Sequence, residues 1–350
     1  MQVKSNTLPE ILGQSKVWSK CLGDLASADL QRLVEGYDPG VTEWVFVGCG
    51  TSYYLAQAAA ATVTELFKAR SRAVPASEIL LNPKQVFPYG AADCFPVLIS
   101  RSGHTSEVLK VAENLNQQKV PFLAVTCDGR ELEHMTPRVL KMDAHEKSVV
   151  MTTSFTSMLL GLQYLAATVA GDKKFIADLE SLPGHLDRLV KIYAPLVEDF
   201  IDKNISLDDF AFLGQGGLYA IACEMALKVM ETSSSYAQYF HTLEFRHGPK
   251  SIAGPKTLIG GLISESSYDV EMPVLAEMKE LGSPIMAITN KATASLREAA
   301  DLLIELNLPV AEMARLIVYV VWGQMFGCYR SLAMGMDPDN PRFLSRVVTI

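Results

Sequence analysis

Three charged side chains in the second half of the sequence have a spacing that suits acid–base chemistry. Glu224, Lys228 and Glu231 are four and three residues apart, so on a helix they share one face. Glutamate and lysine at this spacing usually form a solvated, salt-bridged surface. The flanking residues here are strongly apolar, which favours a face that lines a cleft. A carboxylate there is a candidate general base, and the lysine can tune its pKa or meet substrate oxygens.

A histidine lies downstream of this group. His247 precedes Gly248-Pro249, which is a turn signal. Imidazole changes charge near neutral pH, so a histidine in such a turn is a candidate proton shuttle, with an ordinary turn residue as the alternative. His104 is a candidate ligand contact because it belongs to a hydroxyl-rich loop, whereas the sequence assigns no role to His241.

Two loops in the first half combine glycine with small hydroxyl side chains. Residues 48–52 read Gly-Cys-Gly-Thr-Ser, and residues 100–105 read Ser-Arg-Ser-Gly-His-Thr. Each loop follows an apolar run and precedes a helical pattern, and the N–H groups that start a helix favour an anion. The loops predict a phosphate-monoester site at the carboxyl ends of two strands. Ordinary turn and N-cap residues are the alternative. A dinucleotide site is disfavoured because the third glycine of that fingerprint is missing.

The elements that must position these residues occur twice along the chain. Short apolar runs, each typical of a buried parallel strand, alternate with helical patterns. Three segments of the first half have counterparts in the same order in the second half: 44–52 with 210–218, 96–102 with 261–266, and 121–126 with 284–289. The repeat predicts an α/β fold with two tandem domains, each a doubly wound, mostly parallel sheet flanked by helices.

We expect four regions in the chain. They are a helical lead-in over residues 1–35, a first domain over 36–185, a second domain over 190–335 and a C-terminal tail over 336–350. The second-domain loop that corresponds to 100–105 contains Glu265, an acid next to the expected position of a phosphate. We therefore expect one phosphate site per chain, in the first domain.

Composition and charge argue against several classes of protein. The formal net charge is −8 without basic clusters, so nucleic acid is not an expected partner. The most apolar stretch, Leu316–Tyr329, has about 14 residues, fewer than the ~20 that span a bilayer, and it predicts a buried helix instead of a membrane anchor. The six cysteines form no CxxC pair, and the N-terminus has no apolar signal core. These features predict a cytoplasmic protein without a metal site.

In combination, these segments resemble the SIS (sugar isomerase) superfamily over almost the whole chain, from about Glu10 to Ile350. The resemblance is to tandem-SIS enzymes: the isomerase half of glucosamine-6-phosphate synthase, AgaS-like ketose/aldose phosphate isomerases and SIS-type aminosugar-phosphate deaminases. The motifs that carry it are C-G-T-S at 49–52, S-R-S-G-H-T at 100–105, E-K-S-V-V-M-T-T-S-F-T at 146–156, A-L-K-V-M-E at 226–231, E-F-R-H-G-P-K-S at 244–251 and P-D-N-P at 338–341.

The resemblance implies roles for individual residues. Glu231 matches the base that moves a proton between C1 and C2, and Lys228 matches a nearby lysine. His247 matches the residue that assists opening of the sugar ring and comes from a neighbouring subunit, which implies a homodimer. The positions that match phosphate-binding residues are Thr51, Ser52, Ser100, Arg101, Ser102 and Thr105. Possible sugar contacts are Val149, Met151 and Arg346.

The function that this resemblance implies is a phosphosugar isomerase acting on a ketose/aldose or 2-amino sugar 6-phosphate, with no metal or redox cofactor. Two departures from the synthase are expected to matter. We expect the protein to have no glutaminase domain, and Arg346 replaces a Schiff-base lysine, a role that an always-protonated arginine cannot fill. A non-catalytic sugar-phosphate-binding regulator is the alternative. The identity of the sugar, the balance between isomerisation and deamination, and any assembly beyond a dimer stay open.

Overall fold

The computed structural model describes residues 5–39 and 41–347. The chain forms two compact units, each made from separate stretches of sequence. Among the described residues, the N-sheet unit comprises residues 16–39, 41–146, 153–181 and 345–347, and the C-sheet unit comprises residues 5–15, 147–152 and 182–344. The expected lead-in and tail also include residues 1–4 and 348–350, which lie outside the described residues. The four expected regional boundaries stay predictions.

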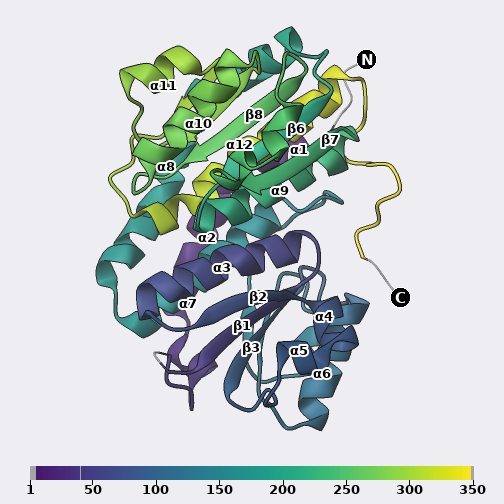
Figure 1. The fold of residues 1–350 in the computed structure, drawn as a ribbon. Coiled ribbons are helices and arrows are strands. Elements are labelled where there is room, and N and C mark those ends of the chain that lie inside the picture. Colours follow the sequence, from purple (N-terminus) through teal and green to yellow (C-terminus); the bar gives the residue numbers. More distant parts are fainter. Residues whose placement is uncertain (1–4, 40, 348–350) are drawn as a thin grey trace. The chain divides into compact units, whose positions relative to one another are not determined.

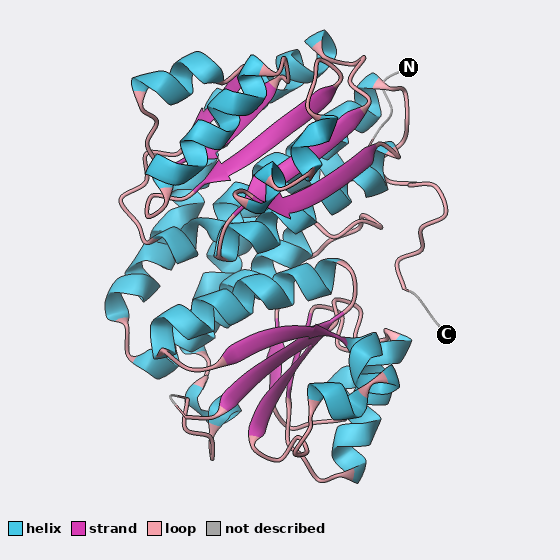
Figure 2. Cartoon of the chain, in the orientation of Figure 1, coloured by secondary structure: helices cyan, strands magenta, loops and turns pink. Residues whose placement is uncertain are grey.

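Each unit is built on one five-stranded sheet whose strands all run parallel (Figures 1 and 2). The strand order is β2-β1-β3-β4-β5 in the N-sheet unit and β7-β6-β8-β9-β10 in the C-sheet unit. The strands are β1 (Glu43–Gly48), β2 (Ser71–Pro75), β3 (Cys94–Ile99), β4 (Leu123–Thr126), β5 (Val139–Lys141), β6 (Asp209–Gly214), β7 (Tyr236–His241), β8 (Thr257–Ile263), β9 (Ile285–Thr289) and β10 (Leu302–Glu305). In both sheets the strand order reverses at the corresponding point, between β1 and β3 and between β6 and β8. The predicted fold class is confirmed.

Helices cover both faces of each sheet (Figure 1). In the N-sheet unit these are α2 (Gln14–Ser27), η1 (Gln31–Val34), α3 (Thr51–Phe67), α4 (Ala76–Leu81), α5 (Pro83–Val86), α6 (Ser106–Gln117), η2 (Leu132–His134) and α7 (Thr153–Ala170). The C-sheet unit has α1 (Thr7–Leu12), α9 (Gly217–Ser233), η3 (Glu244–Arg246), η4 (Pro249–Ile252), α10 (Tyr268–Glu280), α11 (Ala294–Ala299) and α12 (Glu312–Ala333). The long helix α8 (Lys173–Lys203) contributes residues to both units, and the first two residues of α2 belong to the C-sheet unit.

The repeat extends to the backbone of the first crossover in each unit. Helices α3 and α9 both have 17 residues, and both start after a glycine, Gly50 or Gly216, with φ of 54°. A second glycine stands two residues before each of these, at Gly48 and Gly214. A Cβ on Gly48 would lie 2.5 Å from the backbone of Ser52, and one on Gly214 would lie 2.5 Å from that of Leu218. Only glycine lets the strand end approach the helix this closely, so both halves require it.

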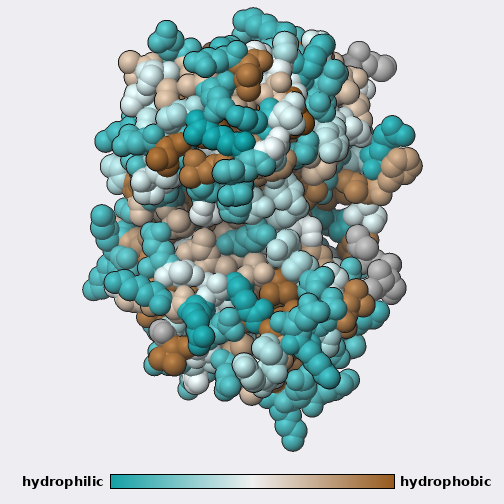
Figure 3. Space-filling model, in the orientation of Figure 1, coloured by the Kyte–Doolittle hydropathy of each residue, from teal (hydrophilic) through white to brown (hydrophobic). Residues whose placement is uncertain are grey.

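The apolar patterns form the expected cores. Alternate strand residues such as Val45 and Val47 pack with Val108 and Val111 of α6. The stretch Leu316–Tyr329 lies within α12 and is buried, as predicted. No helix in the described part of the chain is both long and apolar enough to cross a membrane. On the face drawn in Figure 3, apolar side chains are scattered among polar ones, which is ordinary for a protein surface.

Candidate functional site

The two hydroxyl-rich loops of the N-sheet unit follow β1 and β3, the neighbouring strands between which the strand order of the sheet reverses. Strands β1 and β3 are neighbours, and their connections lead to opposite edges of the sheet. The loop after β1 opens α3 at Thr51, and the loop after β3 opens α6 at Ser106. Ligands of open α/β sheets bind at this switch point. The sequence therefore correctly predicted that both loops start helices. The fold brings the two loops together at the carboxyl ends of neighbouring strands.

Hydrogen bonds within the 100–105 loop hold its hydroxyl groups in fixed places. Ser100 Oγ lies 2.9 Å from Thr105 Oγ1 and accepts a bond from the Gly103 N–H at 3.1 Å. Ser102 Oγ accepts a bond from the His104 N–H at 3.1 Å. The Ser100–Thr105 bond takes up one of those two hydroxyl protons, and the other proton and that of Ser102 can rotate toward an acceptor. Ser100 and Ser102 are buried, so an anion that reached them would meet preordered donors in a low-dielectric place.

The thiol in the first loop is a poor nucleophile. Burial, together with the nearby Glu107 carboxylate, raises the pKa of Cys49 to about 11. The group is therefore a neutral thiol near pH 7, and the loop offers hydroxyls and N–H groups instead of a thiolate. His104, the other reactive side chain near these loops, has its Nδ1 2.7 Å from Oε2 of Glu131.

Arg101 has a partner that the sequence analysis missed. Its Nη1 donates to Oε2 of Glu146 at 2.9 Å, and both side chains are almost fully buried. The Ser154 N–H, in the first turn of α7, donates to the other carboxylate oxygen at 3.1 Å. The guanidinium is thus engaged with a carboxylate, although sequence matching assigned it to phosphate. Glu146 stands in the quoted 146–156 motif, but nothing in its spacing indicated this partner.

Arg346 lies beside the same pair. Its Nη1 donates to the Glu146 carbonyl at 3.0 Å, and its Nη2 is 3.4 Å from a carboxylate oxygen of Asp128. In return, the Arg346 carbonyl accepts a bond from Arg101 Nη2 at 3.2 Å. The structure therefore places this C-terminal arginine against the loop that follows β4, within the N-sheet unit.

The charged cluster forms on α9 of the C-sheet unit. Lys228 Nζ is 3.2 Å from Glu224 Oε1, and it also contacts Glu231 Oε2. Glu224 and Lys228 have no exposed side-chain surface, whereas 19% of the Glu231 side chain is exposed. Burial opposes the charge on Lys228, but the two carboxylates outweigh it and raise the pKa of the ammonium. Glu231 is thus the carboxylate of this cluster that a ligand can approach.

Close packing of α9 on α12 explains this burial. A Cβ on Gly327 of α12 would lie 2.9 Å from the Lys228 carbonyl, and one on Gly323 would lie 2.1 Å from the Met225 side chain. The two glycines, one turn apart, let the helix backbones approach each other. The apolar surroundings noted in the sequence therefore belong to the α9–α12 interface.

His247 lies away from Glu231 within one chain. His241, at the end of β7, pairs with Gly214 just before α9 begins, whereas Glu231 lies in the last turn of that helix. At 1.5 Å per residue, the 14 residues between Gly217 and Glu231 correspond to about 21 Å. Helix η3, which precedes His247, is bonded to α10, because Arg246 Nε donates to Glu277 at 2.7 Å. Helix α10 covers the face of the sheet opposite to the one that α9 covers (Figure 1). His247 is exposed.

Val149 and Met151 belong to a segment held by residues that the sequence did not single out. The backbone N–H of Lys147 donates to Glu10 of α1 at 2.7 Å, and Gln324 of α12 donates to the Thr152 carbonyl at 3.1 Å. Both Val149 and Met151 are partly buried. Since α12 also packs against α9, the C-sheet unit carries this segment and the Lys228 cluster on one connected framework.

The second hydroxyl loop is filled by the protein's own carboxylates. Glu312, at the start of α12, accepts bonds from Ser264 Oγ at 2.7 Å and from the Glu265 N–H at 2.8 Å. Glu271 accepts a bond from the Ser264 N–H at 3.1 Å. The side chain of Glu265 pairs with the nearly buried Arg315. The absence of a phosphate site from this second loop stays a prediction.

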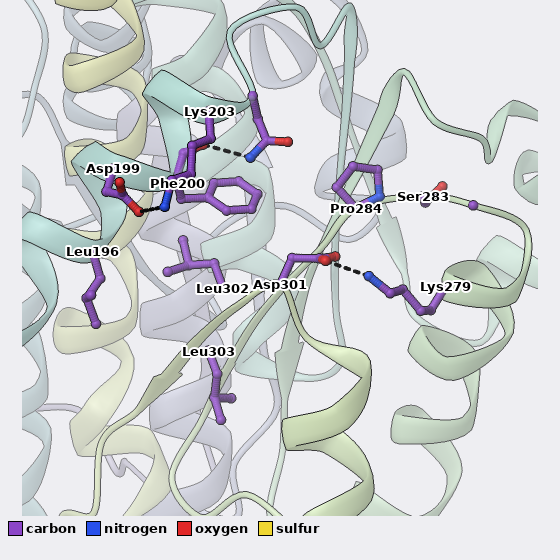
Figure 4. A pocket seen from close by; sticks show the side chains of 12 residues that line it. Leu196, Asp199, Phe200, Lys203, Lys279, Ser283, Pro284, Asp301, Leu302 and Leu303 are labelled. Carbon is purple, nitrogen blue, oxygen red and sulfur yellow. Dashed lines mark hydrogen bonds and ion pairs between the residues drawn. The ribbon is translucent and has the colours of Figure 1, made fainter.

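A cavity of about 650 Å³ lies elsewhere in the C-sheet unit, between α8, α10 and the start of β10 (Figure 4). Its cations already have partners, because Lys203 bonds to Asp199 and Lys279 bonds to Asp301. It contains none of the predicted site residues, and we do not assign it to the reaction. No cluster of three or more metal-ligating side chains occurs among residues 5–39 and 41–347.

Comparison with known proteins identifies the family. The SIS domain model matches residues 43–168 and 208–326, and the chain belongs to the SIS domain family. A D-galactosamine-6-phosphate deaminase AgaS from Shewanella sp. is 25% identical over 96% of this chain and 87% of its own length. The solved glucosamine-6-phosphate deaminase of Thermotoga maritima is 27% identical, with a TM-score of 0.78 over 99% of this chain and 100% of that one.

A further relative differs in length. The isomerizing glutamine–fructose-6-phosphate aminotransferase of Methanothermobacter thermautotrophicus is 25% identical over 87% of this chain but 51% of its own length. The chain thus spans about half the length of the aminotransferases it matches. The matched segments of the two sheets agree with the tandem arrangement, and the resemblance found in the sequence is confirmed.

Proposed function

We propose that the protein is a phosphosugar isomerase that acts on a ketose/aldose or 2-amino sugar 6-phosphate and deaminates the amino sugar. The observation that carries this proposal is the Lys228–Glu231 contact on α9, with Glu231 the partly exposed member of a buried charged cluster. A protein that only binds a sugar phosphate has no need of a carboxylate held in this way. The full-length deaminase relatives support the same reaction class.

The phosphate is bound by the hydroxyl loops of the N-sheet unit. Ser100, Ser102 and Thr105 supply hydroxyl groups, and Thr51 and Ser52 supply groups at the start of α3. The helix start favours a dianion through its N–H groups, so the binding needs no metal ion. Holding the phosphate leaves the reactive end of the sugar to other residues.

Glu231 acts as the base on the open-chain sugar. For a neutral aldose it removes the C2 proton, forms an enediol and returns the proton to C1. For a 2-amino sugar the same transfer leaves an imine at C2, which water hydrolyses to the ketose phosphate and ammonia. Lys228 stays protonated beside Glu231 and steadies the charge that moves onto the substrate oxygen. Val149, Met151 and Arg346 are the proposed sugar contacts.

His247 is proposed to open the sugar ring in the active site of a second copy of the chain. Its separation from Glu231 within one chain, on the other face of the sheet, supports this arrangement. A homodimer is then the smallest active unit. The measurement is activity after mixing inactive Glu231→Gln and His247→Ala proteins. Recovery of part of the activity supports shared sites, whereas no recovery from a mixture that exchanges subunits contradicts them.

The reaction itself is tested by measuring ammonia release from glucosamine 6-phosphate and galactosamine 6-phosphate, with neutral ketose and aldose phosphates followed by NMR. Glu231→Gln should remove most turnover and leave sugar-phosphate binding nearly intact, and Glu280→Gln, an exposed glutamate of the same unit, is the matched control. Binding without turnover by the unmodified protein would instead favour a sugar-phosphate-binding regulator.

A further inference from the structure

Arg101 is fixed at both its backbone and its side chain. Its carbonyl accepts bonds from the N–H groups of Cys127 at 3.0 Å and Asp128 at 2.9 Å. Its guanidinium bonds to Glu146 at 2.9 Å. The residue therefore cannot turn toward a ligand without breaking a buried ion pair, which would leave the Glu146 carboxylate buried without its cation.

Arg101 lies between the two serines of the phosphate loop, so its position affects both of them. Ser100 and Ser102, which flank it, carry hydroxyls proposed to meet the phosphate. Their oxygens accept the N–H groups of Gly103 and His104, so the turn geometry and the hydroxyl positions depend on each other. A shift of Arg101 therefore moves both neighbouring serines.

Glu146 connects this loop to a second element. Its carboxylate accepts the Ser154 N–H in the first turn of α7 as well as the Arg101 guanidinium. The pair is also electrically balanced, because one buried cation faces one buried anion 2.9 Å away. The charge of Arg101 is thus largely compensated before any phosphate arrives, which leaves neutral hydroxyl and N–H donors to bind the anion.

We propose that Arg101 is a positioning residue which, through Glu146, fixes the serine hydroxyls of the phosphate loop, and that the phosphate is bound mainly by neutral donors. This inference rests on the proposed phosphate site. It differs from the role assigned by sequence matching, in which Arg101 is itself a phosphate ligand. The two roles predict different behaviour when both charges of the pair are replaced together.

The test compares Arg101→Gln with the double variant Arg101→Gln/Glu146→Gln. The single change leaves Glu146 buried without its cation, and we expect the Kd for inorganic phosphate, measured by isothermal titration calorimetry, to rise ~10-fold or more. Two amides can hydrogen-bond across the same gap, so the double variant should recover to within about threefold of the unmodified protein. Arg130→Gln, an exposed arginine in the loop after β4, is the charge-matched control.

A double variant that stays as weak as Arg101→Gln would overturn the proposal, because the guanidinium charge itself would then bind phosphate. Thermal unfolding of each protein identifies a variant that fails to fold, and in that case the double variant alone decides the result. With the sugar phosphate as substrate, we expect KM to rise in Arg101→Gln and to recover in the double variant, as the Kd for inorganic phosphate does. The kcat of each variant should stay within about twofold of the unmodified protein. Ser102→Ala tests the site itself: unchanged phosphate binding in that variant would overturn the phosphate loop and this inference with it.

Discussion

Lys228 and Glu224 form an ion pair in which neither side chain has any exposed surface, with Nζ 3.2 Å from Oε1. The same ammonium contacts Glu231, which keeps part of its surface open. One carboxylate therefore compensates the buried charge permanently, and the other is accessible to a substrate. The first prediction follows from this difference between Glu224, which is buried, and Glu231, which is partly exposed.

Glu224→Gln should destabilise the protein at neutral pH by ~3 kcal/mol, because Lys228 then stays buried with one partly exposed carboxylate. The folded-state pKa of Lys228 is raised above 10.5, so the pair contributes its full stability below that pH and loses it as pH rises through the folded value. Urea unfolding at about pH 8 and about pH 11 checks both points, since the difference from the unmodified protein should narrow at the higher pH. Equal stability at pH 8 would contradict this account.

Gly327→Ala should loosen the contact between α12 and α9. The added Cβ would lie 2.7 Å from Thr232 Oγ1 and 2.9 Å from the Lys228 carbonyl, and relief of this overlap costs ~1–3 kcal/mol. Gly184→Ala in α8 is the matched control, because a Cβ there meets nothing within 4 Å, and it should be neutral or stabilising by up to ~1 kcal/mol. Thermal unfolding measures both. A destabilised Gly184→Ala with an unaffected Gly327→Ala would reverse the expected order.

Asp339→Asn should weaken the start of α1. The Asp339 carboxylate accepts the N–H groups of Asn6 at 2.6 Å and Thr7 at 2.9 Å, and these bonds outweigh its burial and lower its pKa below 3.8. Because the side chain is partly exposed, solvent screens the interaction and we expect a loss of ~1 kcal/mol at neutral pH. The stability is present above 3.8 and disappears as pH falls through the folded pKa, so the two proteins should converge in acid unfolding curves. A difference that does not change with pH would argue against the carboxylate.

Glu312→Ala should destabilise the C-sheet unit and leave phosphate binding unchanged. The change removes the acceptor of Ser264 Oγ and the Glu265 N–H, which costs ~2 kcal/mol, while Glu298→Ala on exposed α11 surface should cost under ~0.5 kcal/mol. Calorimetric titration should give one inorganic phosphate per chain in the unmodified protein and in both variants. Two phosphates bound to the unmodified chain would show that the second loop is not filled.

Much of the architecture was predictable because it depends on short-range patterns. Short continuous apolar runs identified the buried strands, helical apolar patterns identified the helices between them, and the glycine-rich turns marked where α3 and α9 begin. The Glu224, Lys228 and Glu231 spacing also placed three charges on one helical face, as the structure has them. A single helix determines that arrangement, so no knowledge of the tertiary fold was needed.

The contacts of Arg101 and His247 depended on tertiary structure. Arg101 and Glu146 are 45 residues apart, and nothing local distinguishes an arginine that meets a phosphate from one that meets a buried carboxylate. The position of His247 relative to Glu231 depends on which face of the sheet each element covers. The sequence by itself determined the elements, their repetition and the chemistry on each face, because these follow from neighbouring residues. Only folding decided the partners of charged groups, because the free energy of burying a charge depends on what the fold brings beside it.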